Sequence, residues 1–352
     1  PAPGRADTLR GCLMLARTAE YLFWAGRYLE RAEDTARLLD VTYHRLLEAT
    51  PAEEAQAWRG VLASVGLEDD YAERGGTLDG SGVSEFLVMD RTNRGSIRTC
   101  VEQARLNARG VREHTTMEFW EAHTSFPHDR AARTPSFELS VQPSELYRFV
   151  RSNVQSVLGV ADGTWTRDDG WRFFMLGVHL ERAEMCARLL RARHPQHRPD
   201  EVHEWYATLR ATSALNAYRR RYRDLDAVHL IELLMLSNDV PRSVLFSLRH
   251  AESILRRLVD PETSAAVRML GRVRAQLEFT DAAELVGGDV MGVLQLVEEQ
   301  VRDVGYAVAA ECFLYRVELD LHSLRVMPGE VPHDHPVSGV SASAVISPAE
   351  EV

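Results

Sequence analysis

A stretch of fourteen residues occurs twice in this chain, at positions 151 residues apart. Residues 26–39 read GRYLERAEDTARLL and residues 177–190 read GVHLERAEMCARLL, so that ten of the fourteen positions are identical. A shared preference for helix-forming residues gives far fewer matches than this. Because self-similarity at a fixed offset is the signature of a repeated structural unit, the sequence predicts two copies of one unit.

Both copies have the periodicity of an amphipathic helix, with charged residues on one flank of the apolar face. At about 100° per residue, the residues around Leu29 and those around Leu180 form an apolar stripe, and Gly26 and Gly177 leave space beside it. Each copy has an arginine four residues after a glutamate, the spacing at which two side chains meet on a helix. The charged residues shared by both copies on this flank are Glu30, Glu33, Arg37, Glu181, Glu184 and Arg188.

Two roles are open for these six residues. A buried carboxylate needs a charged or hydrogen-bonding partner, so in one interpretation the glutamates and arginines form a structural ion-pair network. In the other, a pseudo-two-fold axis brings both flanks to one concave polar cleft that binds a ligand or a partner. Glu33 and Glu184, at the edge of the stripe, favour the structural role. Glu30 and Glu181 lie further out and favour the cleft.

Four carboxylates near one axis also raise the question of a metal site. Di-metal helical bundles use Glu-x-x-His ligand pairs, whereas both copies here have Glu-x-x-Glu. His179 replaces Tyr28 of the first copy on the apolar stripe, which is typical of a core histidine. His333 and His335 lie in a segment predicted to be disordered. We therefore expect no metal and no other cofactor.

The helical period continues along the chain without a convincing alternating strand, which predicts an all-α fold. Residues 96–109 align with residues 243–256 at an offset of 147, with matched apolar spacing and three identities, which favours duplication of a whole multi-helix unit. The expected architecture is a helical bundle built from two pseudo-repeated halves, residues 12–126 and 143–327. The predicted helices cover residues 13–49, 52–66, 83–89, 96–123, 143–161, 168–193, 200–222, 225–237, 241–259, 262–280 and 289–325.

The segments around and between these halves have the composition of irregular chain. Residues 1–11 are expected to form a flexible leader. The polar, proline-containing segment 124–142 is expected to connect the halves. Residues 328–352 are rich in Pro, Ser, Gly and Ala, a composition that favours disorder.

The charged residues exclude several classes of function. The chain has 41 basic and 52 acidic residues and a net charge of −11, which disfavours binding to nucleic acid or to an anionic membrane. Every basic residue is arginine, so chemistry that needs a lysine Schiff base or a phosphate-loop lysine is excluded. Residues 219–223 include four arginines at a predicted helix end, where the helix dipole stabilises cations. We expect this cluster to face solvent or a partner.

The four cysteines, Cys12, Cys100, Cys186 and Cys312, have no paired spacing. This is typical of reduced thiols that fill the core of a cytoplasmic protein. No apolar run approaches the ~18 residues that a membrane span needs. The sequence has no Gly-rich phosphate loop and no nucleophile motif, so it names no catalytic residue.

The segment 14–33 reads MLARTAEYLFWAGRYLERAE, and several short motifs follow it. They are SIR at 96–98, AR at 104–105, NAR at 107–109, EFWE at 118–121 and PRSV at 241–244. Together they resemble the bacterial alpha-E domain family over about residues 12–328. That family is all-helical and takes its name from helices with Glu and Arg motifs.

The resemblance implies a functional context. Alpha-E proteins are encoded with, and sometimes fused to, circularly permuted ATP-grasp proteins, often beside a transglutaminase-like protein and a proteasome-related Ntn peptidase. The resemblance therefore implies an accessory or scaffold subunit of an ATP-grasp-dependent system for peptide synthesis or peptide modification by amide ligation. Such a subunit binds the ligase, its peptide substrate, or both. The resemblance carries over no catalytic residue.

The alternative is a stand-alone enzyme that acts on a peptide or an amino acid through the duplicated Glu/Arg cleft. The missing lysine and the missing nucleophile motif favour the accessory subunit. The expected partners are a circularly permuted ATP-grasp ligase and a peptide substrate, a homodimer is also open, and neither nucleic acid nor a membrane is expected.

Overall fold

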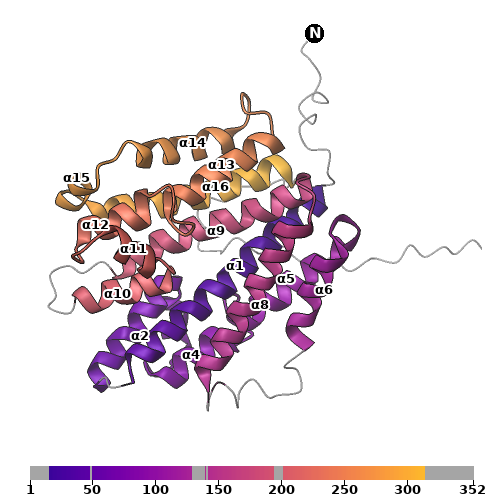
Figure 1. The fold of residues 1–352 in the computed structure, drawn as a ribbon. Coiled ribbons are helices and arrows are strands. Elements are labelled where there is room, and N and C mark those ends of the chain that lie inside the picture. The colour runs from indigo at the N-terminus through magenta and orange to yellow at the C-terminus, as the bar shows by residue number, and fades with distance from the viewer. Residues whose placement is uncertain (1–15, 48–49, 129–138, 140–141, 194–200, 314–352) are drawn as a thin grey trace, which may run out of the picture. The chain divides into compact units, whose positions relative to one another are not determined.

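The computed structural model describes residues 16–47, 50–128, 139, 142–193 and 201–313. In these residues all regular structure is helical: fifteen α-helices, one 3₁₀ turn and one π turn, with no strand (Figure 1). The all-α prediction is thus confirmed. The expected leader 1–11, the expected tail 328–352 and the end of the last predicted helix lie outside the described residues.

The helices fall into two consecutive series along the chain. The first series is α1 (Ala16–Arg45), α2 (Pro51–Val65), α3 (Glu68–Arg74), α4 (Gly80–Val88), α5 (Ile97–Gly110), η2 (Arg112–His114), α6 (Met117–His128) and α8 (Pro143–Thr164). The second series is α9 (Asp169–Arg193), α10 (Glu201–Ala211), α11 (Leu215–Arg221), α12 (Ala227–Ile231), η3 (Glu232–Leu236), α13 (Val244–Leu258), α14 (Ala265–Glu278), α15 (Ala282–Gly287) and α16 (Val290–Cys312).

Two of the predicted long helices are wrong because each is broken in two. The predicted helix 96–123 ends at Gly110, and α6 begins after Thr116, whose hydroxyl oxygen accepts a hydrogen bond from the backbone N–H of Phe119 at 3.1 Å. The predicted helix 200–222 is interrupted at Ser213, which has a left-handed backbone with φ of 58°. The short helices α3 and α15 were not predicted, because one or two turns give no readable apolar period.

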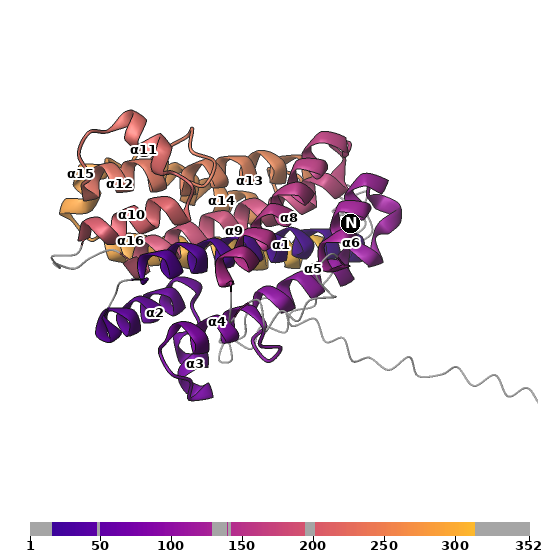
Figure 2. The same cartoon turned by 60° about the horizontal axis from the view of Figure 1, so that its bottom comes forward.

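The two copies of the repeated segment lie in α1 and α9, which pack directly against each other at the centre of the bundle (Figures 1 and 2). A Cβ atom at Gly26 would lie 2.1 Å from the carbonyl oxygen of Phe174, and one at Gly177 would lie 2.1 Å from that of Phe23. The two contacts are reciprocal, because Gly177 lies 151 residues after Gly26 and Phe174 lies 151 residues after Phe23. Glycine is therefore needed at both positions, where the two helix backbones touch.

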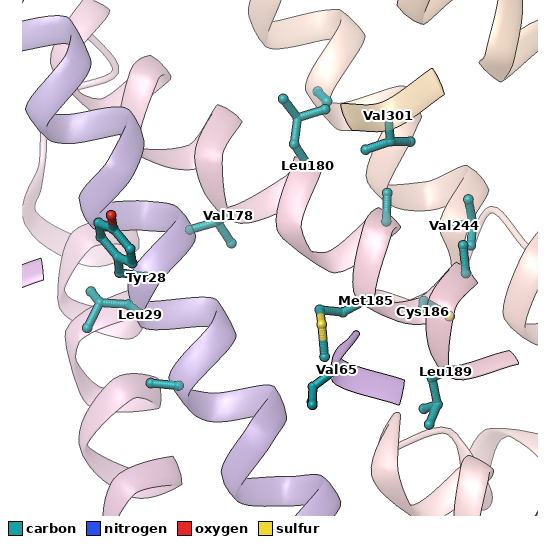
Figure 3. Close-up of a cluster of buried hydrophobic side chains, with 14 of the residues drawn as sticks. Tyr28, Leu29, Val65, Val178, Leu180, Met185, Cys186, Leu189, Val244 and Val301 are labelled. Atoms are coloured by element: carbon teal, nitrogen blue, oxygen red, sulfur yellow. The ribbon is translucent and has the colours of Figure 1, made fainter. Parts of the chain in front are cut away.

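The remaining helices cover the outer sides of this central pair. Helices α5 and α8 pack against α1, and α6 packs against α8. Helices α13 and α16 pack against α9, and α14 lies against both of them (Figure 2). Figure 3 shows part of the buried core, in which Leu29 of α1, Leu180 of α9 and Val301 of α16 are among the labelled side chains.

Corresponding features of the two series recur at a spacing of 147 residues. Helices α3 and α11 begin at Glu68 and Leu215, and α8 and α16 begin at Pro143 and Val290. The helix-capping side chains Asp79 and Asp226, and likewise Ser96 and Ser243, have the same spacing. So do the left-handed residues Gly66 and Ser213, which follow α2 and α10.

Candidate functional site at the α1–α9 interface

The six residues that the sequence singled out are buried on α1 and α9. Their exposed fractions range from 0% for Glu30 and Glu33 to 8% for Arg188. Burial of so many ionisable groups is costly unless each is paired. Their partners therefore decide what the cluster can do.

The glutamate and arginine at the centre of each copy pair with those of the other copy. Arg31 Nε donates to Glu181 Oε1 at 2.6 Å, and Arg182 Nε donates to Glu30 Oε1 at 2.7 Å. Positions 30 and 31 correspond to 181 and 182 in the repeat, so the two ion pairs are reciprocal. The consecutive Glu-Arg residues of each copy thus join α1 to α9 twice.

A second set of pairs lies within each helix, as the spacing predicted. Arg37 pairs with Glu33 on α1, and Arg188 Nη2 donates to Glu184 Oε1 at 2.5 Å on α9. The structure therefore confirms both i,i+4 pairs.

A further arginine binds each pair of glutamates, and the two come from unrelated positions. Arg27 of α1 pairs with Glu181, at 2.6 Å from Nε to Oε2, and with Glu184. Arg242, which precedes α13, pairs with Glu30 at 2.7 Å and with Glu33 at 2.8 Å. Neither arginine is repeated at its offset, so the sequence pattern identifies neither of them as a member of the cluster.

Two arginines of the cluster, Arg188 and Arg37, contact the left-handed turns that follow α2 and α10. Arg188 Nη1 donates to the carbonyl oxygen of Val65, next to Gly66, at 3.3 Å. Arg37 donates to the hydroxyl of Ser213. Arg188 also binds Glu298 of α16 at 3.0 Å. The cluster therefore holds α2, α10 and α16 against the central helices.

The arginines keep Glu33, Glu181 and Glu184 ionised in spite of burial. Burial alone raises the pKa of Glu181, but Arg31 and Arg27 together lower it to about 2. Burial likewise opposes ionisation of Glu33 and Glu184, and the neighbouring arginines hold the pKa of each below its usual range. Carboxylates of such low pKa are poor general bases near neutral pH.

Asp34 behaves differently from these glutamates. Burial raises its pKa to about 7, Arg242 opposes this, and Glu30 and Glu33 add to it. Asp34 pairs with Arg242 and lies at the edge of the cluster. It therefore titrates near neutral pH.

Beside the cluster lies a small pocket of about 30 Å³ between α1, α9, the end of α10 and the residue Arg242. Its charged wall consists of Asp34, Arg182 and Arg242. The described residues that line it include none of the six candidates, so a binding role for those six stays a prediction. Of the described His, Cys, Asp and Glu side chains, no three lie grouped as a metal ion would require.

The other residues noted in the sequence have plain structural positions. His179 is a core histidine, as predicted: it is buried, its ring stacks on that of His250 at 5.1 Å, and burial lowers its pKa well below the usual value. Arg219, Arg220 and Arg221 form the last turn of α11 and are exposed, with Arg221 paired to Glu232 at 2.8 Å. His333 and His335 lie outside the described residues.

The described cysteines are buried and carry no disulfide. Burial raises the pKa of Cys100 and of Cys186 to about 12, so both thiols stay protonated and are weak nucleophiles. In the described part of the chain, no helix has both the length and the apolar character to cross a membrane.

Fold and cluster define a class of protein: an all-helical bundle whose two central helices are joined by buried, reciprocal Glu–Arg pairs. The chain belongs to the Alpha-E family, whose model matches residues 14–313 and is described as a predicted alpha-helical domain with a conserved ER motif. Glu30-Arg31 and Glu181-Arg182 are Glu-Arg sequences at the centre of the cluster.

Three mycobacterial proteins, all named as uncharacterized, are similar to this chain. One is from Mycobacterium bovis and two are from strains of Mycobacterium tuberculosis, and each is 26% identical over 330 residues. The match covers 84% of this chain and 36% of each relative, so the chain spans about a third of their length. No solved structure gave a significant match.

Proposed function

We propose that this protein is a non-catalytic accessory subunit of an ATP-grasp-dependent system that synthesises or modifies peptides by amide ligation. It binds the ligase, its peptide substrate, or both. The observation that carries the proposal is that the charged residues repeated in both copies are engaged in buried ion pairs within and between helices. They serve as the internal frame of a rigid bundle, which is what a scaffold or docking subunit needs.

The state of the ionisable groups supports a non-catalytic role. The glutamates of the cluster are ion-paired, and the pKa values of Glu33, Glu181 and Glu184 are lowered. The thiols of Cys100 and Cys186 are buried and protonated. An ATP-dependent ligation therefore calls for a second protein that binds the nucleotide, and the family resemblance makes a circularly permuted ATP-grasp ligase the natural partner.

The lengths of the relatives support a modular role. Each of the three mycobacterial proteins extends well beyond the part that matches this chain, which is 36% of its length. The matching part of those proteins is therefore covalently joined to further polypeptide. A unit found joined to other sequence is suited to work in contact with a partner protein.

We further propose that the bundle consists of two pseudo-repeated halves, α1–α8 and α9–α16. The 147-residue spacing of helix starts and helix caps supports this. So do the reciprocal contacts of Gly26 and Gly177, which lie 151 residues apart in the chain. The contacts of α8 with α1 and α6 match those of α16 with α9 and α14, so the unit begins with α1 and ends with α8. The first half is then longer than the 12–126 expected from the sequence.

A second candidate function is a stand-alone enzyme that acts on a peptide or an amino acid. The specific observation in its favour is Asp34, whose pKa of about 7 suits a general acid or base and whose side chain lines a pocket with Arg182 and Arg242. This candidate needs activity from the purified chain alone with a peptide or amino acid. The accessory role needs none.

The test is a reconstituted ligation assay with the ATP-grasp protein encoded nearest to this chain. We expect the ligase to co-purify with the chain and its product formation to rise when the chain is added. A ligase that is fully active alone and does not co-purify would reject the proposal. Product formed by the chain without the ligase would establish the enzyme instead.

Variants of the buried cluster separate folding from binding in that assay. Glu33→Gln with Glu184→Gln removes one charge from each pair of glutamates, and its melting temperature is measured first. Loss of stability with unchanged affinity for the ligase assigns these residues to the frame. Unchanged stability with lost affinity assigns them to a binding site. The proposal also places the protein in the cytoplasm, which cell fractionation checks.

A further inference from the structure

The small pocket beside the cluster has one charged wall and one apolar wall. Asp34, Arg182 and Arg242 provide the charges, and Leu38, Met185 and Leu189 are among the apolar residues that face them. We propose that this pocket binds the α-carboxylate of a small aliphatic amino acid, either free or at the C-terminus of a peptide. The identification of that ligand as substrate rests on the proposed function, whereas the binding site itself does not.

The pocket lies where the two copies of the repeat differ. Asp34 of α1 corresponds to Met185 of α9, and both line the pocket. Arg242 corresponds to Gly95 at the offset of 147. The sulfur of Met185 lies 3.8 Å from Arg188 Nη1, and Val65 of α2 lies beside the Met185 side chain (Figure 3). Asp34 and Arg242 therefore have no charged counterpart across the pseudo-repeat, whereas Arg182 corresponds to Arg31.

Arg182 has the unused hydrogen-bonding capacity that an anion requires. Its Nε donates to Glu30 at 2.7 Å, and the described residues provide no hydrogen-bond partner for its two terminal amino groups. Its side chain is 16% exposed and forms part of the pocket wall. The planar guanidinium of arginine matches a carboxylate in shape and binds it through two parallel hydrogen bonds. The terminal amino groups of Arg182 thus point to a carboxylate.

Arg242 and Asp34 complete the polar wall in complementary ways. Both terminal amino groups of Arg242 are paired with the carboxylates of Glu30, Glu33 and Asp34. Arg242 therefore adds positive charge to the wall but does not offer these two groups to a ligand carboxylate. Asp34 is linked to Arg182 by three consecutive ion pairs, through Glu30 and Arg242. An amino acid presents an N–H donor next to its carboxylate, either as an ammonium group or as a peptide amide. Asp34 also lines the pocket, so it is the acceptor that we expect for that donor.

The volume of the pocket limits what enters it. About 30 Å³ holds about two water molecules, which is the space that the two oxygens of a carboxylate occupy. The rest of the ligand lies at the mouth, against the aliphatic side chains. A small aliphatic side chain such as that of alanine can pack there without having to enter the pocket.

Binding is tested on the purified chain without any ligase, by calorimetry with three probes. The probes are L-alanine, N-acetyl-L-alanine and N-acetyl-L-alanine amide, which lacks the carboxylate. We expect at least one of the two acids to bind and the amide not to bind. Tighter binding of N-acetyl-L-alanine identifies a peptide C-terminus as the source, and binding of L-alanine alone identifies a free amino acid.

Two variants and a matched control locate the site. Arg182→Gln should weaken binding about tenfold or more, the loss expected for charged hydrogen bonds. Arg31→Gln is the control, because Arg31 makes the equivalent pair with Glu181 and does not line the pocket. It should retain binding. Ala211→Met fills the pocket and leaves every ion pair intact, so it decides the question if Arg182→Gln fails to fold.

Two results would overturn the inference. One is no binding of either acid to the wild-type chain at millimolar concentration. The other is binding that persists in Ala211→Met, which would place the ligand elsewhere. Because these measurements use the chain alone, they fail or succeed independently of the ligation assay.

Discussion

Replacing Gly177 with alanine should destabilise the protein although alanine is the better helix former. On an exposed helix position the change from glycine to alanine stabilises by about 1 kcal/mol. At Gly177 the new Cβ would lie 2.1 Å from the carbonyl oxygen of Phe23, whereas ordinary contacts are 3.4–4 Å. That oxygen belongs to a helix backbone and cannot rotate away, so α1 and α9 must separate by more than 1 Å where they touch.

The separation has a cost that exceeds the gain in helix propensity. Overpacking a core costs about 1–3 kcal/mol and occasionally more, and here it also stretches the ion pairs of Arg31 and Arg182 across the same interface. We expect Gly177→Ala to lower the free energy of unfolding by about 2 kcal/mol or more. Gly26→Ala should do the same, because its contact with Phe174 is equivalent.

The assay is urea denaturation followed by far-ultraviolet circular dichroism, with Gly159→Ala as the control. Gly159 lies within α8, and a Cβ there meets nothing within 4 Å. The control should therefore be as stable as the wild type or more so. If Gly177→Ala is as stable as Gly159→Ala, the helix backbones do not touch as described and the reasoning fails.

Three further predictions concern titratable groups. The pKa of Glu181 is about 2 in the folded protein, below its unfolded value of ~4.3. Its ion pairs therefore stabilise the fold fully above pH ~4.3, and this stabilisation is lost as the pH falls toward 2. Glu181→Gln should flatten this part of the stability–pH curve. Burial lowers the pKa of His123 to about 4, and neither ring nitrogen has a partner among the described residues. Stability should therefore fall as pH drops from ~6.5 to about 4, and His123→Leu should remove this loss. Cys100 and Cys186 should resist iodoacetamide at pH 8 until the protein unfolds, as mass spectrometry of the alkylated chain would show.

The sequence was sufficient to predict the features that depend on local periodicity. The repeated segments are in α1 and α9, the all-α class is confirmed, and the i,i+4 pairs of Glu33 with Arg37 and Glu184 with Arg188 form as expected. Each of these follows from the 3.6-residue period of a helix and the side chains on one of its faces.

One error arises where the backbone departs from a helix without a glycine or proline at the break, whereas the other predicted helix was carried through Gly110, where α5 ends. Ser213 interrupts the predicted helix 200–222 in a left-handed conformation that serine seldom adopts. The equivalent break after α2 is at Gly66, which the prediction did recognise as a helix end. Ser213 is held there by contact with Arg37, a tertiary interaction that no local pattern reveals.

Non-local partners were beyond the sequence for the same reason. Arg27 and Arg242 bind the glutamates across distances of 154 and 209 residues in the chain, and their own neighbours give no sign of it. The residue that corresponds to Arg27 in the second copy of the repeated segment is Val178, so the repeat gave no reason to select Arg27. Arg27 meets its glutamates only because α1 packs on α9, and Arg242 meets its own only because the segment before α13 lies against α1.

The reciprocal pairs explain why both copies contain the same charges where simple packing would accept leucine. Glu30 is neutralised by Arg182 of the other copy, and Glu181 by Arg31. Loss of either glutamate leaves the arginine of the other copy without its ion-pair partner, and breaking a buried pair in this way costs about 3–5 kcal/mol. Neither copy can then lose its charges alone, so the interface retains both, whereas Asp34 and Arg242 lie outside this constraint and differ between the copies.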